Sequence, residues 1–171
     1  DKYHVPRIAY INKMDIMGAN FYRVVEMMKD RLKCNAVPIQ LPIGSEDDFK
    51  GLIDLVEMKA EVYYDDLGKD MRDEPIPEDM MKMAQKYHDE MVEAAAENDE
   101  TLMEKFFEEE TLTEDEMREG IRKGLVTRSI YPVFCVCAAK DMGVRRLMEF
   151  LGNVVPFVSD MPKLHNTRGE E

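Results

Sequence analysis

Two apolar segments typical of buried strands lie near opposite ends of the chain. Each is followed by a loop of polar or small residues and then by an amphipathic helix. The strands and helices are predicted at residues 7–11 and 20–33 and at residues 131–137 and 144–155. Strand–helix units build parallel sheets, in which loops at the carboxyl ends of neighbouring strands share one edge. The sequence therefore predicts an α/β fold that brings loops 12–15 and 138–143 side by side.

The loop after the first strand reads Asn12-Lys13-Met14-Asp15, and its polar side chains suit a guanine base. The Asp15 carboxylate can accept hydrogen bonds from guanine N1–H and the exocyclic amino group, whereas adenine would leave it unpaired. The Asn12 amide can reach N7 or O6, and the Lys13 side chain can lie over the ring. A solvated turn that only ends a strand is the plainer interpretation, and the motif alone does not decide between them.

The residues between the two units are too many for a loop and carry their own hydrophobic pattern, which predicts an inserted α+β subdomain. Prolines within residues 36–44 predict an edge strand or a short strand there. Further strands are predicted at residues 51–56 and 59–64, and the acidic segment 65–73 is predicted to be a loop.

Three helices are predicted in the second part of the insert. A long one begins near Pro77, a favourable first-turn residue, and Thr101 is expected to cap a short one. Thr113 and Glu116 have the spacing of a capping box for the third.

The chain is strongly acidic, with 36 acidic residues against 23 basic ones and a formal net charge of -13. This charge argues against direct nucleic-acid binding by this segment, because phosphate-binding surfaces need clustered Lys and Arg. It permits a basic protein partner. Glu90, Glu93 and Glu97 form an acidic stripe on the long helix, for which a solvated face is the plainer interpretation and a docking surface the sharper one.

Other classes of protein are disfavoured by composition. No apolar run is long enough for a membrane span, and no signal peptide is visible. The three cysteines are interpreted as reduced thiols of a cytosolic protein, and no metal site is predicted, because the histidines are scattered. The chain does not begin with Met, so we expect it to be a piece of a longer protein.

With these elements placed, most of the chain resembles the elongation factor G family, translational GTPases that drive translocation on the ribosome. The resemblance rests on the segments 12–15, 18–21, 37–44, 49–51, 54–56, 58–60, 102–106 and 135–144. The segments inside the insert are the more specific ones, because other GTPases lack that insert. The resemblance implies the fold of the carboxyl-terminal part of a P-loop GTPase domain, interrupted by an inserted subdomain. The implied division is GTPase domain at 1–36 and 129–156, inserted subdomain at 37–128, and linker at 157–171.

The resemblance also implies site residues and partners. Asn12, Lys13 and Asp15 match the family's guanine-binding motif, and Cys137-Ala138-Ala139 matches its second base-contacting loop, where the Ala138 N–H would donate to guanine O6. Cys137 departs from the family's Ser, and a thiol is a weaker hydrogen-bond partner than a hydroxyl. Glu93 and Glu97 match positions that contact the ribosomal stalk protein.

Parts of a complete GTPase are absent from this sequence. It has no Gly-x-x-x-x-Gly-Lys-Ser/Thr phosphate loop and no Asp-x-x-Gly motif, the elements that hold phosphates, Mg²⁺ and the attacking water. In the family these elements precede the matching region. The expectation is therefore a cytoplasmic parent protein that binds GTP or GDP with Mg²⁺ and hydrolyses GTP on the ribosome. The fragment alone is expected to have no catalytic residue and no hydrolytic activity.

Two alternatives stay open. One is a related translational GTPase of the recycling, release-factor or ribosome-protection kind. The other is a non-catalytic acidic interaction module in which the four-residue motif is accidental.

Overall fold

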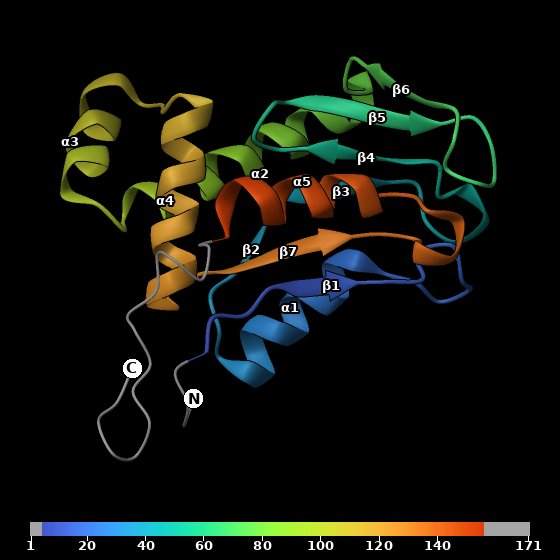
Figure 1. Cartoon of the computed structure of the whole chain (residues 1–171), viewed down its shortest axis with the longest axis horizontal. Helices are drawn as coiled ribbons and strands as arrows, with labels where there is room; N and C mark the ends of the chain where they lie inside the picture. The colour runs from blue at the N-terminus through green and yellow to red at the C-terminus, as the bar shows by residue number, and fades with distance from the viewer. Residues whose placement is uncertain (1–4, 156–171) are drawn as a thin grey trace, which may run out of the picture.

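The computed structural model describes residues 5–155, which fold into two sheets and five longer helices within that range (Figure 1). A parallel sheet has the order β1-β7-β2 and consists of β1 (Ala9–Ile11), β7 (Tyr131–Cys135) and β2 (Ala36–Pro38). An antiparallel sheet runs in the order β3-β4-β5-β6 and consists of β3 (Gln40–Ile43), β4 (Gly51–Asp54), β5 (Lys59–Tyr63) and β6 (Met71–Glu74). The predicted linker at 157–171 lies outside the described residues.

Both predicted strand–helix units are confirmed, but the prediction that the first strand is buried is wrong, because β1 is an edge strand with half-buried or exposed residues. β1 leads to α1 (Phe21–Leu32), whose first turn is capped by the Asn20 side chain, and β7 leads to α5 (Val144–Val154). Phe150 of α5 packs edge-on against Phe134 of β7, with 4.7 Å between ring centroids. The α/β fold with a parallel sheet and an antiparallel-sheet subdomain is therefore the one that the hydrophobic pattern predicts.

The chain passes from one sheet to the other at Ile39. Its N–H donates to the carbonyl of Val133 in the parallel sheet at 2.9 Å, and its carbonyl accepts from Leu55 at 3.0 Å. Pro38 and Pro42 flank this point in β2 and β3, which are edge strands of their sheets, where a proline removes no ladder hydrogen bond if it faces outward. The exact domain boundaries remain predictions.

The predicted long helix and the predicted capping box are confirmed. α2 (Glu78–Ala96) is followed by α3 (Glu100–Glu109) and α4 (Glu114–Thr127). Thr113 and Glu116 cap each other at the start of α4. The prediction that Thr101 caps α3 is wrong. Asp99 is the cap, and its carboxylate accepts from the N–H groups of Thr101 and Leu102.

The prediction of a loop throughout 65–73 is also wrong, because β6 begins at Met71 and pairs with β5. β6 is a polar edge strand without the apolar alternation that predicts strands. Backbone pairing holds it, together with surface ion pairs such as Lys59–Asp73 at 2.9 Å.

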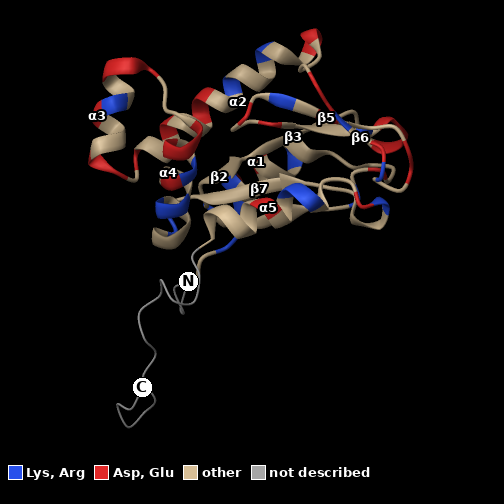
Figure 2. Ribbon diagram, turned by 45° about the horizontal axis from the view of Figure 1, so that its top comes forward, with Lys and Arg blue, Asp and Glu red and all other residues tan. Residues whose placement is uncertain are grey.

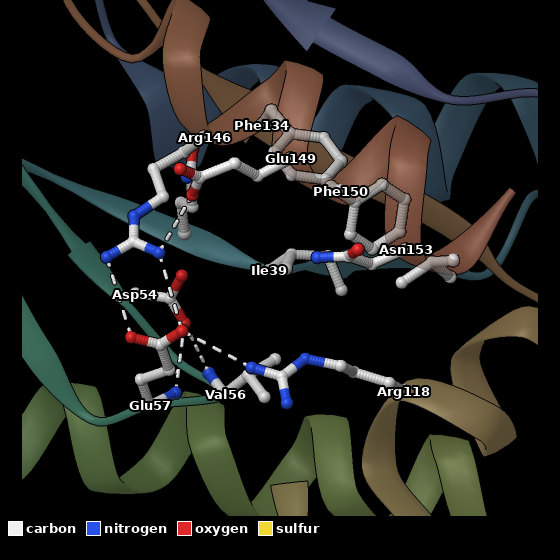
Figure 3. Close-up of a pocket in the computed structure, with 12 residues that line it drawn as sticks. Ile39, Asp54, Val56, Glu57, Arg118, Phe134, Arg146, Glu149, Phe150 and Asn153 are labelled. Carbon is white, nitrogen blue, oxygen red and sulfur yellow. Dashed lines mark hydrogen bonds and ion pairs between the residues drawn. The ribbon is translucent and has the colours of Figure 1, made fainter. Parts of the chain in front are cut away.

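A polar junction connects the helices to the antiparallel sheet (Figure 3). Arg146 of α5 and Arg118 of α4 both reach Glu57, at 3.4 and 3.3 Å, beside a cavity of about 100 Å³. Arg146 also forms an ion pair with Glu61, which is fully buried, and burial raises the pKa of Glu61. Within residues 5–155, no helix is long and apolar enough to cross a membrane.

Candidate functional site

The two predicted loops lie side by side at the carboxyl ends of β1 and β7 (Figure 1). Backbone pairing continues past the strand ends, because Val136 N–H donates to Ile11 at 3.0 Å and Met14 N–H donates to Val136 at 3.2 Å. The Met14 side chain is buried in the core and anchors the first loop there. Backbone hydrogen bonds therefore hold the 12–15 loop against the 137–143 loop.

A side chain of the first loop holds the backbone of the second. The Asn12 Oδ1 atom accepts a hydrogen bond from the Ala138 N–H at 3.1 Å and another from the Lys13 N–H at 2.7 Å. Lys13 has a positive φ of 62°, and its side chain is exposed. The predicted donation from Ala138 to guanine O6 remains a prediction, and the Ala138 N–H donates to Asn12 in the structure.

Asp15 is a half-buried carboxylate, with 17% of its side chain exposed. A hydrogen bond from the Cys137 thiol is the main cause that holds the pKa of Asp15 below its ordinary value, and the Lys140 ammonium 3.7 Å away acts in the same direction. Asp15 is therefore ionised at neutral pH and able to accept from two N–H donors.

Cys137 supports the site despite replacing the family's Ser. Its side chain is buried, and both burial and the Asp15 carboxylate raise the pKa of the thiol. The thiol therefore stays protonated at neutral pH and keeps a hydrogen for Asp15. The backbone of Cys137 exchanges two hydrogen bonds with Met142, at 3.0 and 3.1 Å, and these close the 137–143 loop.

Within this closed loop, η2 (Ala138–Lys140) forms a single helical turn. Ala138 and Ala139 are exposed there, so nothing in the described residues covers the edge that they form with Asn12. A flat ligand can approach the backbone closely at this edge, because alanine side chains are small.

Sequence reasoning missed three contributors to the site. Lys140 forms an ion pair with Asp15. Burial lowers the pKa of Lys140, but the Asp66 and Asp15 carboxylates raise it by more, so the pKa lies above its ordinary value. The position of Lys140 directly after Ala138 and Ala139 was the signal from which its place in the site could have been predicted. Glu46, in η1 (Glu46–Asp48), accepts from Gly18 N–H at 2.7 Å, and Tyr63 accepts from Gly143 N–H at 2.9 Å. These two contacts come from the insert, and no local pattern indicates them.

Glu93 and Glu97 lie away from the two loops. Both are exposed, Glu93 on α2 and Glu97 directly after its last residue, and α2 packs on α3, α4 and β2. Figure 2 shows acidic residues along α2 and α3. A groove of about 620 Å³ beside Glu93 has Met81 and Phe106 in its lining. The acidic stripe is thus accessible on the insert.

The described residues offer no fit for a catalytic metal. Within residues 5–155, no group of three or more His, Cys, Asp or Glu side chains could hold a metal ion. The geometry at the two loops suits a planar base with adjacent N–H donors, and no chemical step follows from these residues alone.

Comparison with known proteins agrees with this geometry. The family model of the elongation factor Tu GTP binding domain matches residues 1–157. A crystal structure of a protein from Thermus thermophilus is similar in fold, with a TM-score of 0.81 and 26% sequence identity. The similarity covers 93% of this chain but only 23% of that chain, so this chain spans about a quarter of its length. The chain therefore belongs to the family of the elongation factor Tu GTP-binding domain, a domain of translational GTPases.

Proposed function

We propose that this chain recognises the guanine base of GTP and GDP within a translational GTPase of the elongation factor G type. The observation that carries the proposal is the hydrogen bond from Ala138 N–H to Asn12, which joins the two predicted base-contacting loops. The ionised Asp15 beside them supplies the acceptor for guanine N1–H and the amino group.

Guanine would be distinguished from adenine by the hydrogen-bond donors that it presents to Asp15. Adenine places no donor pair opposite Asp15, so binding adenine would desolvate the carboxylate without adding hydrogen bonds to those from Cys137 and Lys140. Asn12 and Ala138 lie on the neighbouring edge and suit N7 and O6, while the exposed Lys13 side chain can cover one face of the ring. Ala139 completes the small-residue edge.

We propose further that the parent protein hydrolyses GTP on the ribosome in the cytoplasm. Other residues of the parent would hold the phosphates and Mg²⁺, since this sequence has no phosphate-loop motif. The base contacts alone, about 1.5–3 kcal/mol for each charge-assisted bond, support millimolar affinity for this chain. The choice of elongation factor G over release, recycling or ribosome-protection relatives rests on the resemblance within the insert.

The insert is proposed to contact the basic surface of the ribosomal stalk protein through Glu93 and Glu97. Glu93 is exposed on α2, and Glu97 is exposed at the carboxyl end of that helix, where acidic residues gather on the insert (Figure 2). Replacing both with Lys should weaken stalk binding more at low salt than at high salt, because salt screens exposed charges. Isothermal titration at two salt concentrations tests this. Unchanged binding at low salt would remove α2 from the interface.

The base-recognition proposal is tested by titrating the ¹⁵N-labelled chain with GDP and with ADP. GDP should shift the backbone amide signals of Lys13, Ala138 and Ala139 at millimolar concentration, and ADP should shift them far less. Equal responses to both nucleotides would refute guanine recognition at these loops.

A further inference from the structure

The insert touches the 137–143 loop directly, through the β5–β6 hairpin (residues 59–74). Tyr63, at the end of β5, is buried, and its hydroxyl oxygen accepts a hydrogen bond from the Gly143 N–H at 2.9 Å. Gly143 ends the loop with a positive φ of 81° and is itself buried. The hairpin therefore satisfies a buried backbone donor of the loop, which would otherwise cost the free energy of a lost hydrogen bond.

The turn of the same hairpin also lies against the backbone of the 137–143 loop. Gly68 has a φ of +68°, and a Cβ atom there would lie 2.6 Å from the Lys140 carbonyl oxygen and 2.9 Å from the Asp141 carbonyl carbon. Only glycine permits this approach of backbone to backbone. Asp66, beside it in the turn, forms an ion pair with Lys140 at 3.5 Å.

Lys140 connects this contact to the base-recognition residues. Its ammonium group lies between Asp66 of the hairpin and Asp15 of the 12–15 loop, at 3.5 and 3.7 Å. Its backbone N–H donates to the Cys137 carbonyl at 3.1 Å, within the turn that presents Ala138. A displacement of the hairpin would thus move Lys140 together with the backbone next to Ala138.

We propose that the β5–β6 hairpin holds the second base-contacting loop in its binding conformation, with Tyr63 as the positioning residue. This inference rests on the proposed function for its effect on nucleotide affinity. The geometry links the insert to the base site, so an event that shifts the hairpin changes guanine affinity.

The chain offers a matched control one residue away. Tyr64 directly follows β5, but it is exposed, and its hydroxyl donates to Glu74 rather than to the loop. Tyr63→Phe and Tyr64→Phe each remove one hydroxyl oxygen, and only the first removes a contact to the loop. Asp66→Asn and Asp70→Asn form a second matched pair on the surface, because Asp70 pairs with Arg72 within the hairpin.

Two readouts on the ¹⁵N-labelled chain test the proposal. Amide hydrogen exchange at Lys140, Asp141, Met142 and Gly143 should accelerate at least about tenfold in Tyr63→Phe and stay unchanged in Tyr64→Phe, with the amides of β3 and β4 unaffected in both. GDP affinity, from titration, should fall at least about threefold in Tyr63→Phe and in Asp66→Asn, relative to their controls.

The outcomes separate this proposal from the proposed function. Unchanged exchange in the loop of Tyr63→Phe would overturn the positioning role, whether or not nucleotide binds. Equal GDP affinity in both members of each pair would overturn it as well. A wild-type chain that responds equally to GDP and ADP would refute the base-recognition proposal, while the exchange measurement would still decide whether the hairpin holds the loop.

Discussion

Removing the Arg146 side chain from the polar junction should destabilise the fold through Glu61. Glu61 is fully buried, one of its carboxylate oxygens accepts from the Arg146 guanidinium, and the other has no partner among the described residues. Arg146→Met keeps most of the apolar stem and removes every donor. The variant thus leaves a carboxyl group in the core that must stay charged without a partner or take up a proton.

The magnitude follows from the cost of protonation. The ordinary pKa of the Glu61 carboxyl is 4.5, so protonating it at pH 7 costs about 1.4 kcal/mol for each of about 2.5 pH units, or roughly 3.5 kcal/mol. This agrees with the range of about 3–5 kcal/mol for breaking a buried pair. The contacts of Arg146 with the more exposed Glu57 and Glu149 add at most about 1 kcal/mol each.

The sign of the pH dependence is fixed by burial. A carboxyl whose folded-state pKa is raised binds its proton more tightly in the folded state, so stability is highest below the unfolded value and falls as pH rises. For Arg146→Met, the loss relative to wild type should therefore shrink from at most about 3.5 kcal/mol at pH 7 to at most about 1 kcal/mol at pH 5, since the raised pKa already costs the wild type part of this free energy.

Urea unfolding of the chain at these two pH values measures the effect. Arg145→Met is the matched control, because Arg145 is the neighbouring residue, is 72% exposed and pairs with Glu149 at the surface, and it should cost less than about 1 kcal/mol. Glu61→Gln added to Arg146→Met should restore much of the stability at pH 7. A loss that is below about 1 kcal/mol at pH 7, or that does not change with pH, would refute the reasoning.

Two further predictions concern stability. Gly68→Ala should cost at least about 1 kcal/mol more than Gly18→Ala, because both have positive φ but only the Cβ at Gly68 would meet backbone atoms within 4 Å; equal losses in thermal unfolding would contradict the close approach. Hydrogen bonds from Lys105 and Thr113 lower the pKa of Glu116 to about 2. Its stabilising effect should be complete above its ordinary value of 4.5 and should disappear as pH falls toward about 2. Glu116→Gln should remove this part of the acid sensitivity, and identical acid unfolding curves for wild type and variant would count against a stabilising role of the ionised Glu116 carboxylate.

The strand–helix units could be predicted because their signals are local. Apolar runs ending in polar or small residues mark β1 and β7, and Thr113 with Glu116 marks the start of α4. β6 could not be predicted, because Met71–Glu74 is polar and has no apolar alternation. It is a strand because its backbone pairs with β5, which the local sequence does not indicate. At α3, Asp99 and Thr101 both suit a cap, and only the backbone geometry selects Asp99.

The meeting of the two candidate loops was predictable from the sequence, and the contacts that hold them were less so. The motif with Asn12 and Asp15, together with parallel topology, predicts that the two loops meet, as they do. The support of Asp15 by Cys137 and Lys140 depends on side-chain positions across strands. The contact of Gly68 with the second loop joins segments distant in sequence, and a single glycine in an acidic loop does not indicate it.

The most direct test of guanine recognition is the nucleotide preference of Asp15→Asn. The substituted amide can donate to the 2-oxo group of xanthine, whereas it no longer accepts from both donors of guanine. Titration of the ¹⁵N-labelled chain with GDP and with XDP should show GDP affinity at least about tenfold weaker than in wild type, because each lost charge-assisted bond contributes about 1.5–3 kcal/mol. XDP should then be preferred over GDP. An unchanged preference for GDP in this variant would contradict the role of Asp15 and the account built on it.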